Sequence, residues 1–195
     1  MQSTGNSDVC QGVDMKELSL HLLDVAQNSL RAEAKHLRIA LCEGDRRIRM
    51  TVADDGQGMP PDVLSHATKP FFSTKGTEGA GLGLYLLAQT VERTGGSLHL
   101  ASRDQQSYPD EHGTTLTAEL ISTHIDCPPM GDTVATVLAL LQGSPEVDLH
   151  FSHAVEGRTV TLDTRELRAI LGTGVPLNTP EVLSWVREFL TEQYQ

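Results

Sequence analysis

Apolar residues recur at helical spacing in two long stretches of the first half of the chain. The first stretch has an apolar face made of Leu18, Leu22, Val25, Ala26 and Leu30. Together with a capping box headed by Asp14, this spacing predicts a helix that continues to about Ala34. The second stretch predicts a helix over residues 82–93, which the Thr94-Gly95-Gly96 sequence should end. A shorter helix is expected over residues 61–67.

Alternating apolar and polar residues predict strands between and after these helices. Residues 36–54 are expected to form a hairpin with its turn at Glu43-Gly44-Asp45. Two further strands are expected at 97–102 and 113–121, joined by a polar turn. Mixed strands and helices of this kind predict an α/β fold.

The character of the chain changes around residues 126–132, and we place a domain boundary near residue 124. The elements expected beyond it are a helix at 132–142, a hairpin at 147–163 and helices at 164–171 and 180–191. This pattern suits either a small docking module or a structural cap on the sheet of the first domain. Trp185 is expected to be a core anchor rather than a contact residue.

Charge excludes some classes of partner. The chain has 195 residues and a formal net charge of −11. Nucleic acids and anionic membranes are bound by clusters of basic residues, so neither is an expected partner. The three cysteines match no zinc or redox spacing, and the first dozen residues are too polar for a signal peptide. We therefore expect a cytoplasmic protein without a membrane span.

The first expected helix carries polar residues on a stripe away from its apolar face. Asp24 and Asn28 are four residues apart, so they lie on the same side of the helix, with His21 and Arg31 nearby. A solvated helix face would look the same. The stripe therefore indicates a functional site only in combination with the motifs that follow it in the sequence.

Two glycine-rich segments come later. Asp54 ends a strand and enters a turn with Gly56 and Gly58, where the backbone can pass close to a flat ring because no Cβ intervenes. Residues 79–83 (GAGLG) precede an apolar helix, and helix N-termini stabilise phosphates. Lys75, before these glycines, is either a solvated lysine or a phosphate ligand.

In combination, these segments resemble the motifs of the GHKL superfamily, which contains gyrase B, the heat-shock chaperone ATPase, histidine kinases and MutL. HLLDVAQNSLRAEAKHLRI is similar to its N box, VADDGQGM to its G1 box, and KPFFSTK to the F box of histidine kinases. GAGLGLYL is similar to the G2 box and GTTLTAEL to the closing strand. The five motifs occur in the family's order within residues 14–123.

The resemblance implies a two-layer α/β sandwich, the Bergerat or histidine-kinase-like ATPase fold. A flexible tail at 1–13 would precede the ATP-binding domain at 14–123, and a small α+β module at 124–195 would follow it. The implied ligands are ATP and Mg²⁺.

Each site residue takes the role of the motif position that it matches. Asn28 would coordinate Mg²⁺, and Asp54 would select adenine above a pocket floor made by Gly56 and Gly58. Thr115 would lie beside the adenine. The residues implied at the phosphates are Lys75, Gly79, Gly81, Leu82 and Gly83.

One position departs from the family pattern. ATP-hydrolysing members carry Glu four residues before the magnesium Asn, and this chain has Asp24 there. A catalytic base must reach its water, and Asp is one methylene shorter. Asp24 is therefore either the catalytic base, directly or through a shifted water, or a residue that only keeps the site in shape.

Three functions are compatible with these motifs. Only about 14 residues precede the N-box helix, too few for the helical hairpin that bears the phosphoacceptor histidine in typical histidine kinases. The first hypothesis is therefore a kinase that transfers phosphate in trans to an unidentified partner protein. The second is a slow ATPase whose nucleotide state switches a partner, and the third is a nucleotide-bound module that sequesters one. The sequence leaves the partner and the oligomeric state open.

Overall fold

The computed structural model describes residues 17–70, 82–172 and 174–195. Its helices are α1 (Leu18–Arg31), α2 (Pro61–Leu64), α3 (Gly83–Arg93), α4 (Thr133–Gly143), α5 (Thr164–Leu171) and α6 (Pro180–Gln193). Its strands are β1 (His36–Gly44), β2 (Arg47–Asp54), β3 (Ser97–Arg103), β4 (Gly113–Ile121), β5 (Asp148–Val155) and β6 (Arg158–Asp163). Every element predicted from the described residues is present.

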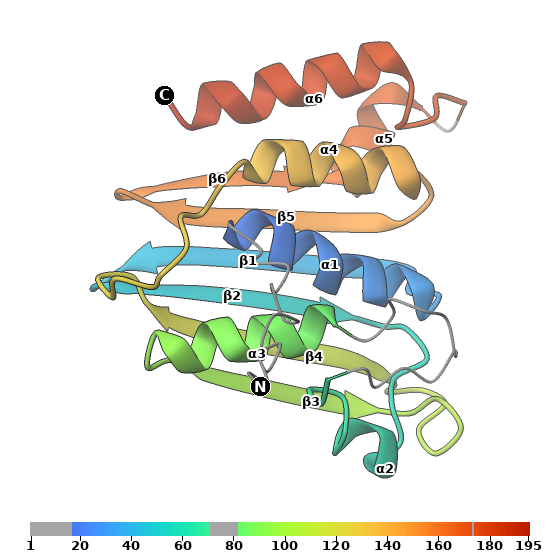
Figure 1. The fold of residues 1–195 in the computed structure, drawn as a ribbon. Coiled ribbons are helices and arrows are strands. Elements are labelled where there is room, and N and C mark those ends of the chain that lie inside the picture. The colour runs from blue at the N-terminus through green and yellow to red at the C-terminus, as the bar shows by residue number, and fades with distance from the viewer. Residues whose placement is uncertain (1–16, 71–81, 173) are drawn as a thin grey trace, which may run out of the picture.

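The strands form a single six-stranded sheet in the order β3-β4-β2-β1-β5-β6. Helices α1, α3 and α4 lie side by side over one face of this sheet (Figure 1). All neighbouring strands are antiparallel except β1 and β5, which are parallel. This arrangement is the predicted two-layer α/β sandwich.

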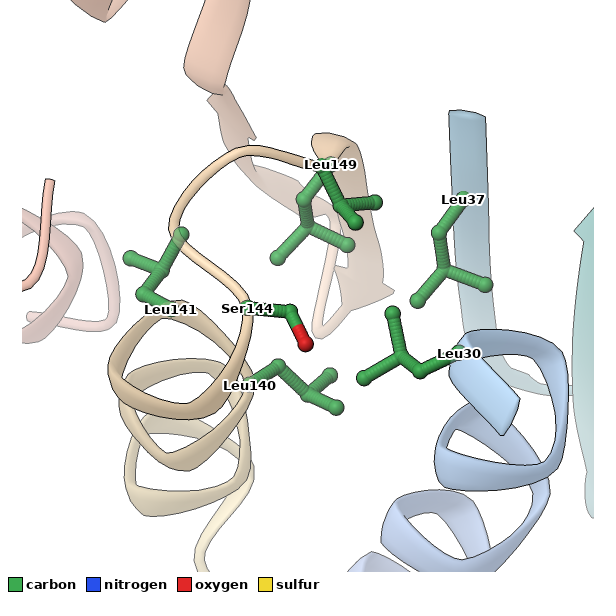
Figure 2. Close-up of a pocket in the computed structure, with 7 residues that line it drawn as sticks. Leu30, Leu37, Leu140, Leu141, Ser144 and Leu149 are labelled. Atoms are coloured by element: carbon green, nitrogen blue, oxygen red, sulfur yellow. The ribbon is translucent and has the colours of Figure 1, made fainter. Parts of the chain in front are cut away.

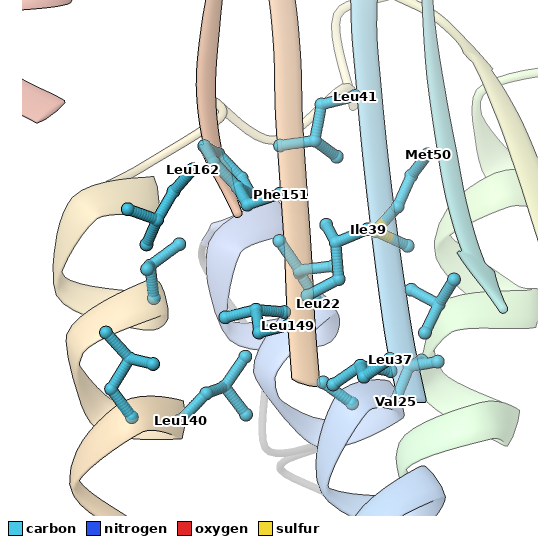
Figure 3. Packing of buried hydrophobic residues seen from close by; sticks show 14 of the residues in the cluster. Leu22, Val25, Leu37, Ile39, Leu41, Met50, Leu140, Leu149, Phe151 and Leu162 are labelled. Carbon is cyan, nitrogen blue, oxygen red and sulfur yellow. The ribbon is translucent and has the colours of Figure 1, made fainter. Parts of the chain in front are cut away.

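The core lies between the helices and the sheet. Alternate residues of β1 and β2, such as Ile39 and Met50, point toward the helices and are almost fully buried. Leu22 and Val25 of α1 meet them from the helical layer (Figure 3). Burial of side chains of this size stabilises the fold by roughly 1.5–3 kcal/mol each. Packing of the apolar face of α1 in the core therefore determines which way the stripe with Asp24 and Asn28 points.

The start of α1 differs from the prediction. The helix begins at Leu18, with Glu17 rather than Asp14 at the N-cap position, and the Glu17 side chain makes no capping hydrogen bond. Asp14 itself lies outside the described residues. The amide groups of Leu18 and Ser19 donate instead to the carbonyl oxygens of Pro129 and Met130, at 3.0 and 2.8 Å. A distant segment thus supplies acceptors for the helix N-terminus, which a local sequence pattern cannot reveal.

Residues 124–195, which we call the C-terminal segment, continue the sheet of the preceding residues. Strand β5 pairs with β1 in parallel, and Phe151 and Val186 of this segment belong to the same buried cluster as Leu22. Of the two alternatives for this segment, the shared sheet and core support the structural one. The domain boundary near residue 124 stays a prediction.

Polar contacts also connect the C-terminal end of the chain to the sheet. The His153 ring lies between the Tyr194 hydroxyl, 2.8 Å from Nδ1, and Glu43 Oε1, 3.0 Å from Nε2. The Tyr194 hydroxyl is also 2.9 Å from Thr133 Oγ1 at the start of α4. The chain's last helix is therefore fixed to β1, β5 and α4 by a continuous set of hydrogen bonds.

Candidate nucleotide site

The side chain of Asp54 is fixed at the end of β2 by hydrogen bonds on both carboxylate oxygens. Oδ2 accepts from the Ser29 hydroxyl at 2.5 Å, and Oδ1 accepts from the amides of Gly56 and Thr114 at 2.9 and 3.2 Å. Asp54 is half-buried. A carboxylate held in this way can accept a hydrogen bond from the exocyclic amine of adenine in a defined direction.

The backbone after Asp54 passes close to its neighbours at both glycines. The Gln57 amide donates to the Ala32 carbonyl at 2.8 Å, and a Cβ on Gly56 would lie 2.8 Å from the same oxygen. Gly58 has φ +65°, and a Cβ there would overlap the Arg103 carbonyl. The two glycines therefore let the loop pack between the end of α1 and the end of β3. Their role as the floor of a base pocket stays a prediction.

The structure corrects the role that was predicted for Thr115. Asp54 pairs with Thr114 across β2 and β4, and Thr115 pairs with Ala53, so Thr115 points to the opposite face of the sheet. Thr115 is exposed on that face. Thr114 has the place expected for Thr115, and its Oγ1 lies 2.8 Å from Ser102 Oγ. The same Ser102 Oγ accepts from the Met59 amide at 2.8 Å, so Thr114 also supports the loop.

Asp24 lies on α1 against the first residue of α3. A Cβ built on Gly83 would come within 2.7 Å of Asp24 Oδ2. The N-terminus of a helix carries partial positive charge, and a phosphate or an activated water there would be close to the carboxylate. Burial raises the pKa of the Asp24 carboxyl, and the positive charge of Arg31 opposes this effect. A raised pKa suits a group that takes a proton.

Asn28 lies one helical turn after Asp24, on the same side of α1. Its Oδ1 accepts a hydrogen bond from Arg31 Nη1 at 2.6 Å. An amide oxygen is a ligand that Mg²⁺ accepts, and Mg²⁺ is usually bound by few protein ligands together with nucleotide phosphates. Within the described ranges no group of three or more His, Cys, Asp or Glu could hold a metal ion. The amide oxygen of Asn28 is of a type that fits Mg²⁺ bound jointly with ATP, and its role as a metal ligand stays a prediction.

Part of the predicted phosphate region lies outside the described residues, namely Lys75, Gly79 and Gly81. Leu82 precedes α3, and its carbonyl accepts from the Leu86 amide at 2.8 Å. Gly83 is the first residue of the helix. The structure therefore places the helix start next to Asp24, and the roles of the three earlier residues stay predictions.

Sequence reasoning missed two further residues of the site, Ser29 and Ser102. Ser29 is 4% exposed and bonds directly to Asp54, whereas Ser102 connects Thr114 to the loop at Met59. A signal for Ser29 was present, because it is a small polar residue that follows Val25 and Ala26 at core spacing on α1. Ser102 has no such signal before the register of β3 and β4 is known.

A small pocket lies apart from these residues. It is bordered by the ends of α1 and α4 and by the starts of β1 and β5 (Figure 2). Its lining consists of Leu30, Leu37, Leu140, Leu141, Ser144, Val147 and Leu149. A lining with a single polar side chain offers nothing to a triphosphate. The polar residues described above, and not this pocket, therefore remain the candidate nucleotide site.

His21 lies on the polar stripe of the predicted helix but is buried. It is 1% exposed, and its Nε2 lies 3.3 Å from Thr90 Oγ1 of α3. Burial, together with the charge of Arg93, lowers the pKa of His21 to about 4. His21 therefore joins α1 to α3 as a neutral imidazole.

No helix among the described residues has the length and apolar character needed to cross a bilayer.

Comparison with known protein families identifies the family of the first part of the chain. The model of the family described as histidine kinase-, DNA gyrase B-, and HSP90-like ATPase matches residues 13–124, more than half of the chain. The matched range contains all of the predicted site residues. The match ends at residue 124, which is the first residue of the C-terminal segment.

Individual relatives match over the same region. The sensor histidine kinase ZraS of Escherichia coli K12 is 32% identical over 93 residues, which cover 47% of this chain and 20% of that protein. Sporulation kinase D of Bacillus subtilis is 36% identical over 83 residues, which cover 42% of this chain and 16% of that protein. The match thus spans a fifth or less of the length of these relatives.

A solved structure resembles the chain over a longer range. The N-terminal domain of a DNA repair protein has a TM-score of 0.57 and 13% identity, and the match covers 83% of this chain and 58% of that one. At this identity the resemblance concerns the fold alone.

Proposed function

The chain belongs to the histidine kinase-, DNA gyrase B-, and HSP90-like ATPase family, and we propose that it binds ATP with Mg²⁺ and transfers the γ-phosphoryl group to a partner protein in trans. The observation that carries this proposal is the fixed carboxylate of Asp54, which lies within the same group of elements as Asp24 and Asn28. A base-recognising group and a phosphate-handling group are both needed to hold a nucleotide in a reactive orientation.

The adenine end of the nucleotide would lie over the loop after β2. Asp54 Oδ1 and Oδ2 accept from three protein donors, and a carboxylate has about four acceptor positions. One position is left for the amine of adenine. Guanine would present a carbonyl oxygen there instead, which repels a carboxylate, so the site is selective for adenine.

The phosphate end would lie between α1 and the start of α3. Asn28 would hold Mg²⁺, which neutralises charge on the phosphates when it is bound. Asp24 would take the proton of the attacking group at its Oδ2, which faces Gly83. Lys75, Gly79 and Gly81 would surround the phosphates.

A partner protein supplies the acceptor in this proposal. His21 on the N-box helix cannot reach a phosphate, because it is buried beneath α3 and bonded to Thr90. The matched relatives are named as kinases, which supports transfer rather than simple hydrolysis. The alternative is a slow ATPase that switches a partner. The carboxylate of Asp24 is compatible with hydrolysis as well as with transfer, because water can replace the acceptor.

The test is incubation of the full chain with γ-labelled ATP and Mg²⁺, alone and with an extract of the cells that express it. Label on a second protein supports transfer in trans, and label found only in free phosphate supports the ATPase. Asp54→Asn should abolish both signals, because the amide places a donor where the adenine amine must donate. Absence of both label and free phosphate with the unaltered chain would contradict both functions.

Matched substitutions separate catalysis from folding. Asp24→Asn should reduce turnover far more than ATP affinity, whereas Asp62→Asn, an exposed residue at the start of α2, should change neither. Asn28→Ala should weaken ATP binding in the presence of Mg²⁺ and have little effect in its absence. Equal losses with and without the metal would contradict the role of Asn28.

A further inference from the structure

Asp55, the residue after Asp54, makes a second set of contacts that hold the loop after β2. We call this loop the adenine loop, because the proposed adenine-binding residue Asp54 begins it. Asp55 Oδ1 accepts from the amides of Lys35 and His36, each at 2.8 Å, and Asp55 Oδ2 lies 2.6 Å from His36 Nδ1. These bonds connect the loop after β2 to the start of β1. Desolvation alone would raise the pKa of Asp55, but the hydrogen bonds from His36 and Lys35 hold it below its usual value. Asp55 is therefore a charged clamp on the loop that begins at Asp54.

The other ring nitrogen of His36 faces the C-terminal segment. His36 Nε2 lies 3.5 Å from Asp148 Oδ2, at the first residue of β5. His36 and Asp148 are also direct partners in the parallel pairing of β1 with β5. The imidazole thus lies between two carboxylates, that of Asp55 on the adenine loop and that of Asp148 on the C-terminal segment.

Asp148 is in turn fixed within the C-terminal segment. Its Oδ1 accepts from Arg168 of α5, and Arg168 Nη2 also donates to the carbonyls of Pro145 and Val147 at 2.7 and 3.0 Å. The side chain of Asp148 is 29% exposed, compared with 63% for His36. Asp148 is therefore held more firmly than the histidine that it contacts.

We infer that His36 is a positioning residue for the adenine loop, and that through its contact with Asp148 it couples the C-terminal segment to nucleotide affinity. The inference rests on the proposed ATP site at Asp54. His36 does not touch the nucleotide in this scheme, and it acts by orienting Asp55, whose neighbour Asp54 recognises the base. The C-terminal segment, which lies outside the matched family region apart from residue 124, thereby acquires a role in ATP binding.

The expected effect is moderate because both contacts of His36 are partly exposed. Exposed ion pairs contribute about 0.2–1 kcal/mol, so loss of the His36 side chain should weaken ATP binding by about twofold to fivefold. A loop held by Asp55 alone would keep its backbone bonds from Lys35 and His36. The affinity should therefore fall without a collapse of the site.

The test measures ATP affinity of the full chain by calorimetry, and thermal stability in parallel. The variants are His36→Ala, Asp148→Asn, the double variant, and His36→Arg, whose guanidinium can donate to both carboxylates. His124→Gln is the matched control, because His124 forms a comparable pair with Asp126 at 3.7 Å beyond the far end of β4.

We expect His36→Ala to weaken ATP binding at least as much as Asp148→Asn does, and the double variant to bind no more weakly than His36→Ala alone. His36→Arg and His124→Gln should keep the affinity of the unaltered chain. The inference is overturned if the unaltered chain binds ATP and His36→Ala binds it equally well, or if the two single losses multiply. Failure of the unaltered chain to bind ATP would instead contradict the proposed function.

Discussion

The carboxylate of Asp24 lies against Gly83, where a Cβ would approach Asp24 Oδ2 to within 2.7 Å and its Cβ and Cγ to within 3.3 Å. The two residues belong to different helices, α1 and α3, and are 59 positions apart in the sequence. This contact means that the start of α3 and the candidate base cannot move independently. The geometry at the start of α3, where we propose that the phosphates bind, therefore depends on glycine at position 83.

Gly83→Ala tests this dependence. The added methyl group must displace the Asp24 carboxylate, which is the mobile end of a side chain, so we expect the fold to persist and turnover to fall by about tenfold or more. The measurement is phosphate release at saturating ATP, with the melting temperature as a check of folding. An unchanged turnover rate would show that the position of the Asp24 carboxylate is not important for the reaction.

Ser29→Ala tests the support of Asp54. The hydroxyl bonds to Asp54 Oδ2 at 2.5 Å, and a hydrogen bond to a charged group contributes about 1.5–3 kcal/mol. We expect ATP affinity to fall by roughly tenfold, measured by calorimetry. Ser65→Ala is the control, since the Ser65 hydroxyl on the nearby exposed turn donates only to the Asp62 carbonyl at 2.8 Å and contacts the neighbouring His66.

Thr114→Val and Thr115→Val test the correction made to the closing strand. Thr114 Oγ1 meets Ser102 beneath the loop, and Thr115 lies on the exposed face of the sheet. We expect Thr114→Val to weaken ATP binding by about fivefold, the effect of losing a neutral hydrogen bond, and Thr115→Val to leave it unchanged. A selective loss with Thr115→Val would restore the original prediction and contradict the register-based one.

These residues show what could be predicted from the sequence. The roles of Asp24, Asn28 and Asp54 were proposed from short motifs, because spacing within one helix or at one strand end is local. Thr114 could also have been chosen, since it has the same parity along β4 as Leu116, which is buried. The prediction of Thr115 relied on a motif match and did not use this parity.

Other features depend on contacts between distant segments and left no local signal. The acceptors for the start of α1 come from Pro129 and Met130, more than 100 positions away. The parallel pairing of β5 with β1 likewise cannot be read from either strand alone. Trp185 was expected in the core but is 46% exposed and stacks on Phe189. Helix α6 packs against the fold through one stripe of residues, and Trp185 does not lie on that stripe.

His21 predicts how stability depends on pH. Its pKa is lowered from 6.5 to about 4 in the folded chain, so the unfolded chain binds a proton between these pH values that the folded chain does not. The stability that the neutral imidazole provides is complete above about pH 6.5 and is lost progressively as the pH falls toward 4. At about 1.4 kcal/mol per pKa unit, this shift corresponds to a loss on the order of 3 kcal/mol.

His21→Gln should therefore flatten the pH dependence of stability in this range, although it lowers stability at pH 7 through the loss of packing against Thr90. The measurement is the free energy of unfolding from denaturant titrations at several pH values between 4 and 7.5. His99→Gln, at an exposed position on β3, should keep the slope of the unaltered chain. If His21→Gln retains that slope, the acid sensitivity arises from groups other than this buried histidine, and the contact between α1 and α3 tolerates its protonation.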